Sequence, residues 1–189
     1  MGNRYLIVSD FHLSDVEDHP DGWMAHKSSR FVFDDDFFDL VQEFLLEGTA
    51  EDHALTLVLN GDIIDFDLVT AIPDDPPWPV CRSEHLRGLE ASEEKSVWKL
   101  RRVLADHPIF VRTLAAFLSA GHEVVYILGN HDREFHYGKV KEVFVEALVE
   151  AANEFRGRRA TEAGGPGVNG EIGTDGGSRT ELGVGSKGS

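Results

Sequence analysis

Three apolar segments of the sequence each end in residues that can bind a divalent metal. The segments and the residues that follow them are Tyr5 to Ser9 before Asp10-Phe11-His12, Leu55 to Leu59 before Asn60-Gly61-Asp62, and Val124 to Leu128 before Gly129-Asn130-His131-Asp132. One such Asp or Asn is ordinarily a turn former or a helix cap. The ordered set, with each member directly after an apolar segment, instead predicts a site for divalent metal with carboxylate, amide and imidazole ligands.

The apolar segments have the composition of buried strands in a parallel sheet. Val124 to Leu128 is rich in β-branched and aromatic residues and is stopped by Gly129, as expected for such a strand. Strand, helix and strand with short connections indicate an α/β fold. In open sheets of this kind ligands bind beyond the carboxyl ends of the strands, so we expect the metal-binding residues to meet in one crevice.

Helical periodicity predicts the elements that position these strands. Each predicted helix carries an apolar stripe, and the boundaries are Asp34 to Glu47 with Gly48 just beyond the end, Glu93 to about Ala105 capped by Ser92, Pro108 to a stop at Gly121, and Lys139 to about Phe155. The predicted domain therefore covers residues 1–156. Residues 157–189 are Gly-rich without apolar periodicity, so we expect a disordered tail; a truncated or frameshifted end is the alternative.

Two loops could lie near the site. The polar stretch from Ser14 to about Arg30 contains side chains that could line a substrate opening or belong to a surface insertion, namely Trp23, Met24, His26, Lys27 and Arg30. Residues 72–80 read IPDDPPWPV, which is too rich in proline for a helix or a central strand. This second loop could be a lid or a segment anchored by Trp78.

Composition excludes some classes of function. The chain has 189 residues and a formal net charge of −16, which argues against an extended nucleic-acid surface. The single Cys81 cannot form an internal disulfide, in keeping with a reducing compartment. No segment has the length of a membrane span, and the N-terminus resembles a core strand rather than a signal peptide. These features predict a cytoplasmic protein and leave its oligomeric state open.

The three metal-binding turns carry a family resemblance. Asp10-Phe11-His12, Gly61-Asp62 and Gly129-Asn130-His131-Asp132 resemble, in order and in strand context, the first three motifs of the calcineurin-like metallophosphoesterases. The resemblance covers about residues 4–155 and implies an αββα sandwich with a two-metal site. It implies that Asp10 and His12 bind one metal, that Asp62 bridges both metals, and that Asn130 binds the second.

The same resemblance assigns two catalytic residues. His131 would help to bind the phosphate and stabilise or protonate the leaving oxygen. Asp65 would orient His131, as an aspartate does in the serine/threonine phosphatase branch. A hydroxide held between two divalent ions would attack phosphorus in line, with Mn²⁺ as the working choice and Fe, Zn²⁺ or Co²⁺ as alternatives.

The chain departs from the family pattern after the third motif. The family has two further metal-binding motifs, one with a His and one with Gly-His-x-His, whereas the only histidine after His131 is His136. We therefore expect a sandwich that is incomplete on its C-terminal side. The predicted function is hydrolysis of a phosphate mono- or diester or a pyrophosphate, with a small soluble phosphate ester as substrate. The alternative is a catalytically incomplete remnant with weak metal or partner binding.

Overall fold

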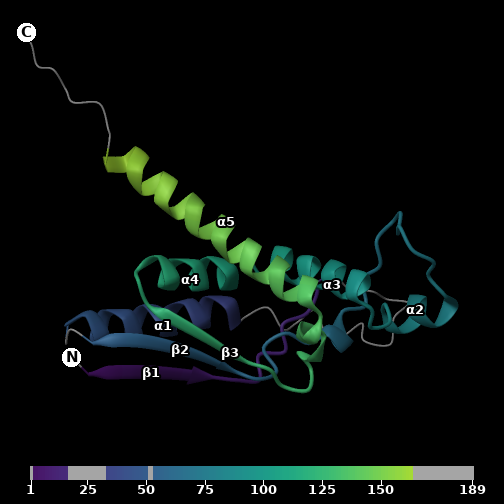
Figure 1. The fold of residues 1–189 in the computed structure, drawn as a ribbon, viewed down its shortest axis with the longest axis horizontal. Coiled ribbons are helices and arrows are strands. Elements are labelled where there is room, and N and C mark those ends of the chain that lie inside the picture. The colour runs from purple at the N-terminus through teal and green to yellow at the C-terminus, as the bar shows by residue number, and fades with distance from the viewer. Residues whose placement is uncertain (1, 17–32, 51–52, 164–189) are drawn as a thin grey trace, which may run out of the picture.

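The described part of the chain is a mixed α/β structure. The computed structural model describes residues 2–16, 33–50 and 53–163 (Figure 1). Its strands and α-helices are β1 (Asn3–Val8), α1 (Phe33–Ala50), β2 (Ala54–Asn60), α2 (Arg82–Arg87), α3 (Glu93–Asp106), α4 (Pro108–Ser119), β3 (Glu123–Ile127) and α5 (Gly138–Ala163), with short 3-10 helices η2 (Phe66–Leu68) and η3 (Arg133–His136). None of the helices in these ranges is long and apolar enough to cross a membrane.

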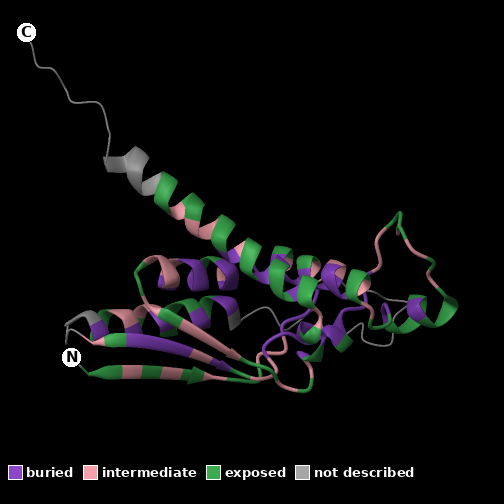
Figure 2. Cartoon of the chain, viewed as in Figure 1, coloured by how far each residue is buried: buried purple, intermediate pink, exposed green. Residues whose placement is uncertain are grey.

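The three strands form one parallel sheet in the order β1-β2-β3. β2 lies in the middle, and its Leu55, Leu57 and Leu59 are buried in the core. Figure 1 shows α1 and α4 on one side of the sheet. Tyr5 and Ile7 of β1 are 57% and 64% exposed (Figure 2), so helices cover only one face of this sheet in the described structure.

β3 corrects one expectation from the sequence. Its apolar run predicted a buried strand, but β3 is an edge strand whose side chains are half-buried or exposed. Ile127 is 46% exposed, and Leu128 just beyond the strand is 44% exposed. An apolar run gives the same pattern at the edge and in the centre of a sheet, because periodicity reports side-chain chemistry and not the number of neighbouring strands.

α1 continues past the glycine that was expected to follow its end. Gly48 lies inside the helix and is buried. A β-carbon on Gly48 would lie 2.3 Å from a terminal carbon of Leu55. The glycine therefore allows α1 to approach β2 closely, a role that the pattern of a helix end does not distinguish from a C-terminal stop.

The predicted starts of α3 and α4 are confirmed. Ser92 precedes α3, and its hydroxyl accepts a hydrogen bond from the Lys95 N–H, which satisfies one of the free donors of the first turn. Pro108 is the first residue of α4, where its fixed φ and missing N–H cost little. Phe110, Leu114 and Phe117 of α4 are buried in the core as predicted.

The remaining segments differ in part from expectation. Residues 72–80 contain no regular element, as predicted, but the short helix α2 follows them and was not predicted. α5 runs to Ala163, beyond the expected end at Phe155, since the Arg, Ala and Glu residues that follow favour helix. Residues 164–189 of the expected tail, and all five candidate lining residues of the first loop, lie outside the described residues.

Candidate metal centre

Backbone hydrogen bonds join the three turns at the carboxyl ends of the strands. The Asp10 N–H donates to the Gly61 carbonyl over 3.1 Å, and the His12 N–H donates to the Asp62 carbonyl over 2.9 Å. The Gly61 N–H donates in turn to the Ile127 carbonyl of β3 over 2.9 Å. The turn after β1 is thus fixed to the turn after β2, and the turn after β2 is fixed to the end of β3.

Three predicted metal ligands have strained backbone. Asp10, His12 and Asp62 have φ values of 58°, 50° and 54°. Within the described ranges no other residue except glycine has a positive φ. This left-handed conformation is uncommon for residues with a β-carbon and costs free energy, and such strain gathers at functional sites.

The same three side chains form a group with the composition of a metal site. Asp10, His12 and Asp62 each offer one ligand atom, and these atoms lie within 4.8 Å of one another. Two carboxylates and an imidazole at this separation suit a divalent transition metal. Asp10 is exposed and the other two are half-buried, so a ligand could enter from solvent.

Asp65 lies behind this group and contacts two histidines. Its side chain is 3% exposed. The Oδ1 atom accepts hydrogen bonds from the N–H groups of Asp67 and Leu68 over 3.1 and 3.0 Å. The Oδ2 atom lies 2.9 Å from Nδ1 of His12 and 3.0 Å from Nδ1 of His131. The orientation at His131 does not make a hydrogen bond, so Asp65 orients His12 directly and lies next to His131.

The contact with Asp65 prepares His12 for a ligand. Since the Asp65 carboxylate accepts a proton from Nδ1 of His12, Nε2 is the nitrogen left to bind a metal. Metal-binding histidines in proteins ordinarily make this kind of bond to a carboxylate. His12, Asp65 and His131 also lie within 4.8 Å by ligand atoms, but Nδ1 of His12 cannot both donate to Asp65 and bind a metal. We therefore interpret this second group as a hydrogen-bonding arrangement.

The turn after β3 brings its residues against Asp62. The His131 N–H donates to Asp62 Oδ1 over 2.9 Å, which leaves Asp62 Oδ2 for a metal. A β-carbon on Gly129 would lie 2.3 Å from Asp62 Oδ1, so only glycine fits there. Asn130 lies in the same turn with an exposed side chain. The two ligand groups consist of imidazole and carboxylate atoms alone and do not include its amide.

Asp132 is a functional residue to which the sequence gave no role. Its side chain is fully buried, and its two oxygens accept hydrogen bonds from four donors. These are the N–H groups of Ile63, Ile64 and Gly129 at 3.4, 2.7 and 3.1 Å and the hydroxyl of Tyr126 at 2.8 Å. Asp132 thereby joins the Asp62 turn to the end of β3. Burial, and then the nearby Asp132 carboxylate, raise the pKa of the Tyr126 hydroxyl, which keeps it a donor.

Comparisons with known proteins do not add a family to this description. No protein-family model matches the chain, and neither the curated proteins nor the solved structures include a match. The argument for function therefore depends on the residues and geometry of the three turns.

Proposed function

We propose that this chain carries the metal-dependent phosphoesterase site of a calcineurin-like metallophosphoesterase, at the carboxyl edge of the sheet of an αββα sandwich. The observation that supports the proposal best is the strain at Asp10, His12 and Asp62, the three residues whose ligand atoms also converge. Folding holds these residues in costly conformations. A structural role for three turn formers would not require their ligand atoms to meet.

The donor set fits divalent metal. Asp10, His12 through Nε2, and Asp62 would hold one ion, and Asp62 with Asn130 would contribute to a second. Mn²⁺ is our first choice, and Fe, Zn²⁺ or Co²⁺ suit the same ligands. When bound, such ions would activate water and neutralise the oxygens of a phosphate mono- or diester or a pyrophosphate.

The chain's own residues would position the reacting groups and move a proton. Asp65 fixes the ring of His12 through the 2.9 Å contact at Nδ1. The His131 side chain is 33% exposed and its ring lies 4.8 Å from that of His12. In the protonated form, His131 would donate a proton to the leaving oxygen, and the Asp65 carboxylate 3.0 Å away would stabilise the imidazolium.

The test is hydrolysis of bis(p-nitrophenyl) phosphate by the full chain with added Mn²⁺. We expect turnover that requires metal and that Asp62→Asn lowers by at least about 100-fold, because the substitution removes a ligand charge. Asp67→Asn is the matched control, since Asp67 is exposed and pairs with Arg133 outside the ligand group. Equal activity in the two variants, or turnover insensitive to chelator, would contradict the proposal.

A second candidate is a metal-binding protein without turnover. Among the described residues, imidazole and carboxylate atoms provide three ligands for one ion, whereas a second ion would depend on Asp62 and Asn130. Calorimetry with Mn²⁺ separates the two candidates. One ion bound per chain, lost in Asp62→Asn and without any hydrolysis, would favour the second.

A further inference from the structure

The free edge of β3 has backbone groups that face away from the sheet. In the described structure β3 pairs only with β2. The Ile127 carbonyl accepts from Gly61 on the β2 side. Because successive residues of a strand direct their N–H and C=O groups to opposite sides, the backbone groups of Val124 and Tyr126 point to the free edge. Such an edge is a template for another strand.

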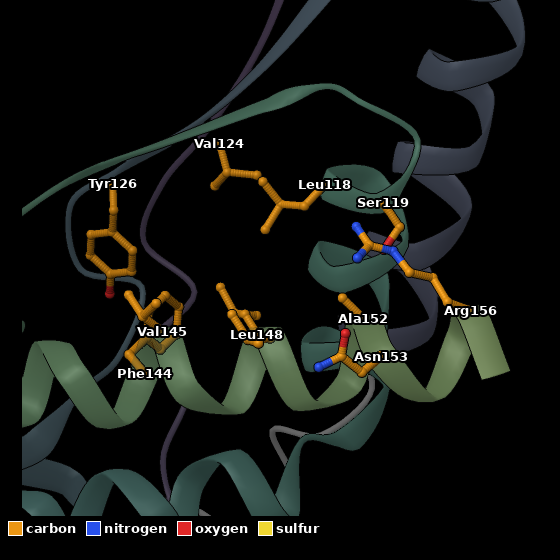
Figure 3. A pocket seen from close by; sticks show the side chains of 11 residues that line it. Leu118, Ser119, Val124, Tyr126, Phe144, Val145, Leu148, Ala152, Asn153 and Arg156 are labelled. Carbon is orange, nitrogen blue, oxygen red and sulfur yellow. The ribbon is translucent and has the colours of Figure 1, made fainter.

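An apolar groove runs along this edge. It consists of a hollow of about 440 Å³ between β3, the end of α4 and α5, shown in Figure 3, and an adjoining hollow of about 340 Å³. The two share Tyr126, Phe144 and Val145. Figure 3 shows Val124 and Leu118 across from Val145 and Leu148 of α5. Val145 and Val149 are 57% and 53% exposed, so α5 presents apolar side chains here without cover from another described element.

The charges around the groove are basic although the protein is acidic. Arg156 lines the larger hollow and Lys141 the adjoining one. No Asp or Glu is among the described residues that line either hollow, in a chain with 34 acidic and 18 basic residues. The apolar middle of the groove is therefore flanked at each end by one positive charge.

We infer that this groove binds an extended, apolar segment of another protein with acidic residues at its ends, which adds to the sheet beside β3. The free backbone groups of Val124 and Tyr126 fit a strand and would leave a helix without hydrogen bonds. Alternate side chains of the strand would enter the apolar groove, and the terminal carboxylates would meet Lys141 and Arg156. Strand addition uses main-chain hydrogen bonds for affinity and such pockets for specificity.

The binding test uses a fluorescein-labelled peptide of about nine residues that alternates Val and Thr and has a glutamate at each end. Fluorescence anisotropy with the full chain, in the presence of chelator, should show saturable binding, because the groove lies outside the metal ligands. A peptide with N-methyl groups on the residues that face β3 should bind at least about tenfold more weakly, since it cannot donate to the edge. Equal binding of both peptides would overturn strand addition.

Two further comparisons test the groove and its charges. Val145→Asp should weaken binding at least about tenfold, whereas Leu46→Asp, on α1 at 74% exposure, should not change it. A peptide with a lysine at each end should bind more weakly than the glutamate peptide, and Lys141→Glu should reduce that difference. Circular dichroism checks folding of the variants. No saturable binding by any peptide would overturn the proposal, as would self-association of the chain that Val145→Asp abolishes, because the occupant would then be a second copy.

Discussion

Asp132 and Glu134 are two residues apart, both fully or nearly fully buried, and have opposite surroundings. Asp132, in the turn at the sheet edge, accepts hydrogen bonds from four donors. Glu134, in η3 against α3, has no such bond to either side-chain oxygen from another described residue. Burial raises the pKa of Glu134, although the Lys99 charge opposes this. Burial lowers the pKa of Lys99, although Glu134 opposes it.

The difference shows how the fold distributes its polar groups. At the sheet edge a buried carboxylate is stabilised by backbone N–H groups, so its charge holds three turns in place. In the helix interface a buried acid and base have electrostatic contact without direct hydrogen bonds between them, so both shift toward their neutral forms. A buried charge contributes to stability when its hydrogen bonds are made and costs stability when they are not.

The largest expected effect is at Asp132. Asp132→Asn replaces an acceptor oxygen by an NH₂ group that faces backbone donors, and we expect a loss of about 3 kcal/mol in the free energy of unfolding. Urea denaturation measures it. Asp67→Asn is the control, because its exposed ion pair with Arg133 should contribute less than about 1 kcal/mol. Similar losses in the two variants would show that the four hydrogen bonds do not stabilise the turns.

A smaller effect is expected at His107, a buried residue with both ring nitrogens bonded. Its Nδ1 lies 2.9 Å from Asp34 Oδ1 and its Nε2 lies 2.8 Å from the Ser14 carbonyl. Both partners are acceptors, so both nitrogens carry protons. Burial lowers the pKa of His107, but the Asp34 carboxylate and the Ser14 carbonyl outweigh burial and raise it.

The consequence is a pH-dependent contribution to stability. Because the folded pKa of His107 is raised, its stabilisation is fully present below the unfolded value of 6.5 and is lost as the pH rises through the folded pKa. His107→Gln should cost about 2 kcal/mol at pH 6, and urea midpoints of variant and wild type should converge as the pH rises. A difference that does not change with pH would mean that His107 is neutral in the fold.

The smallest effect is expected at Glu134. Glu134→Gln should change the free energy of unfolding at pH 7 by less than about 1 kcal/mol, because the substitution removes a charge that lacks hydrogen bonds. Since the folded pKa of Glu134 is raised, wild type loses stability relative to the variant as the pH rises above the unfolded value of 4.5. Urea denaturation from pH 4 to 8 tests this direction. A loss as large as that of Asp132→Asn would remove the contrast between the two regions.

Much of the fold was predictable because it depends on local chemistry. The three strands and the starts of α3 and α4 follow from apolar runs, Ser92 and Pro108, whose preferences act over a few residues. α2 was missed because a helix of this length has little periodicity. Gly48 misled because a glycine serves equally at a helix end and at a close contact with Leu55.

The sequence by itself determined which residues stand at the carboxyl ends of the strands, because strand ends are set by local composition and turn chemistry. Only the tertiary structure decided that β3 is an edge strand, that Asp132 joins two turns, and that Asp65 contacts His12 from 53 residues away. These features depend on contacts between segments that are distant along the chain. Such contacts are fixed by packing of the whole sheet and its helices, and the spacing of residues does not contain them.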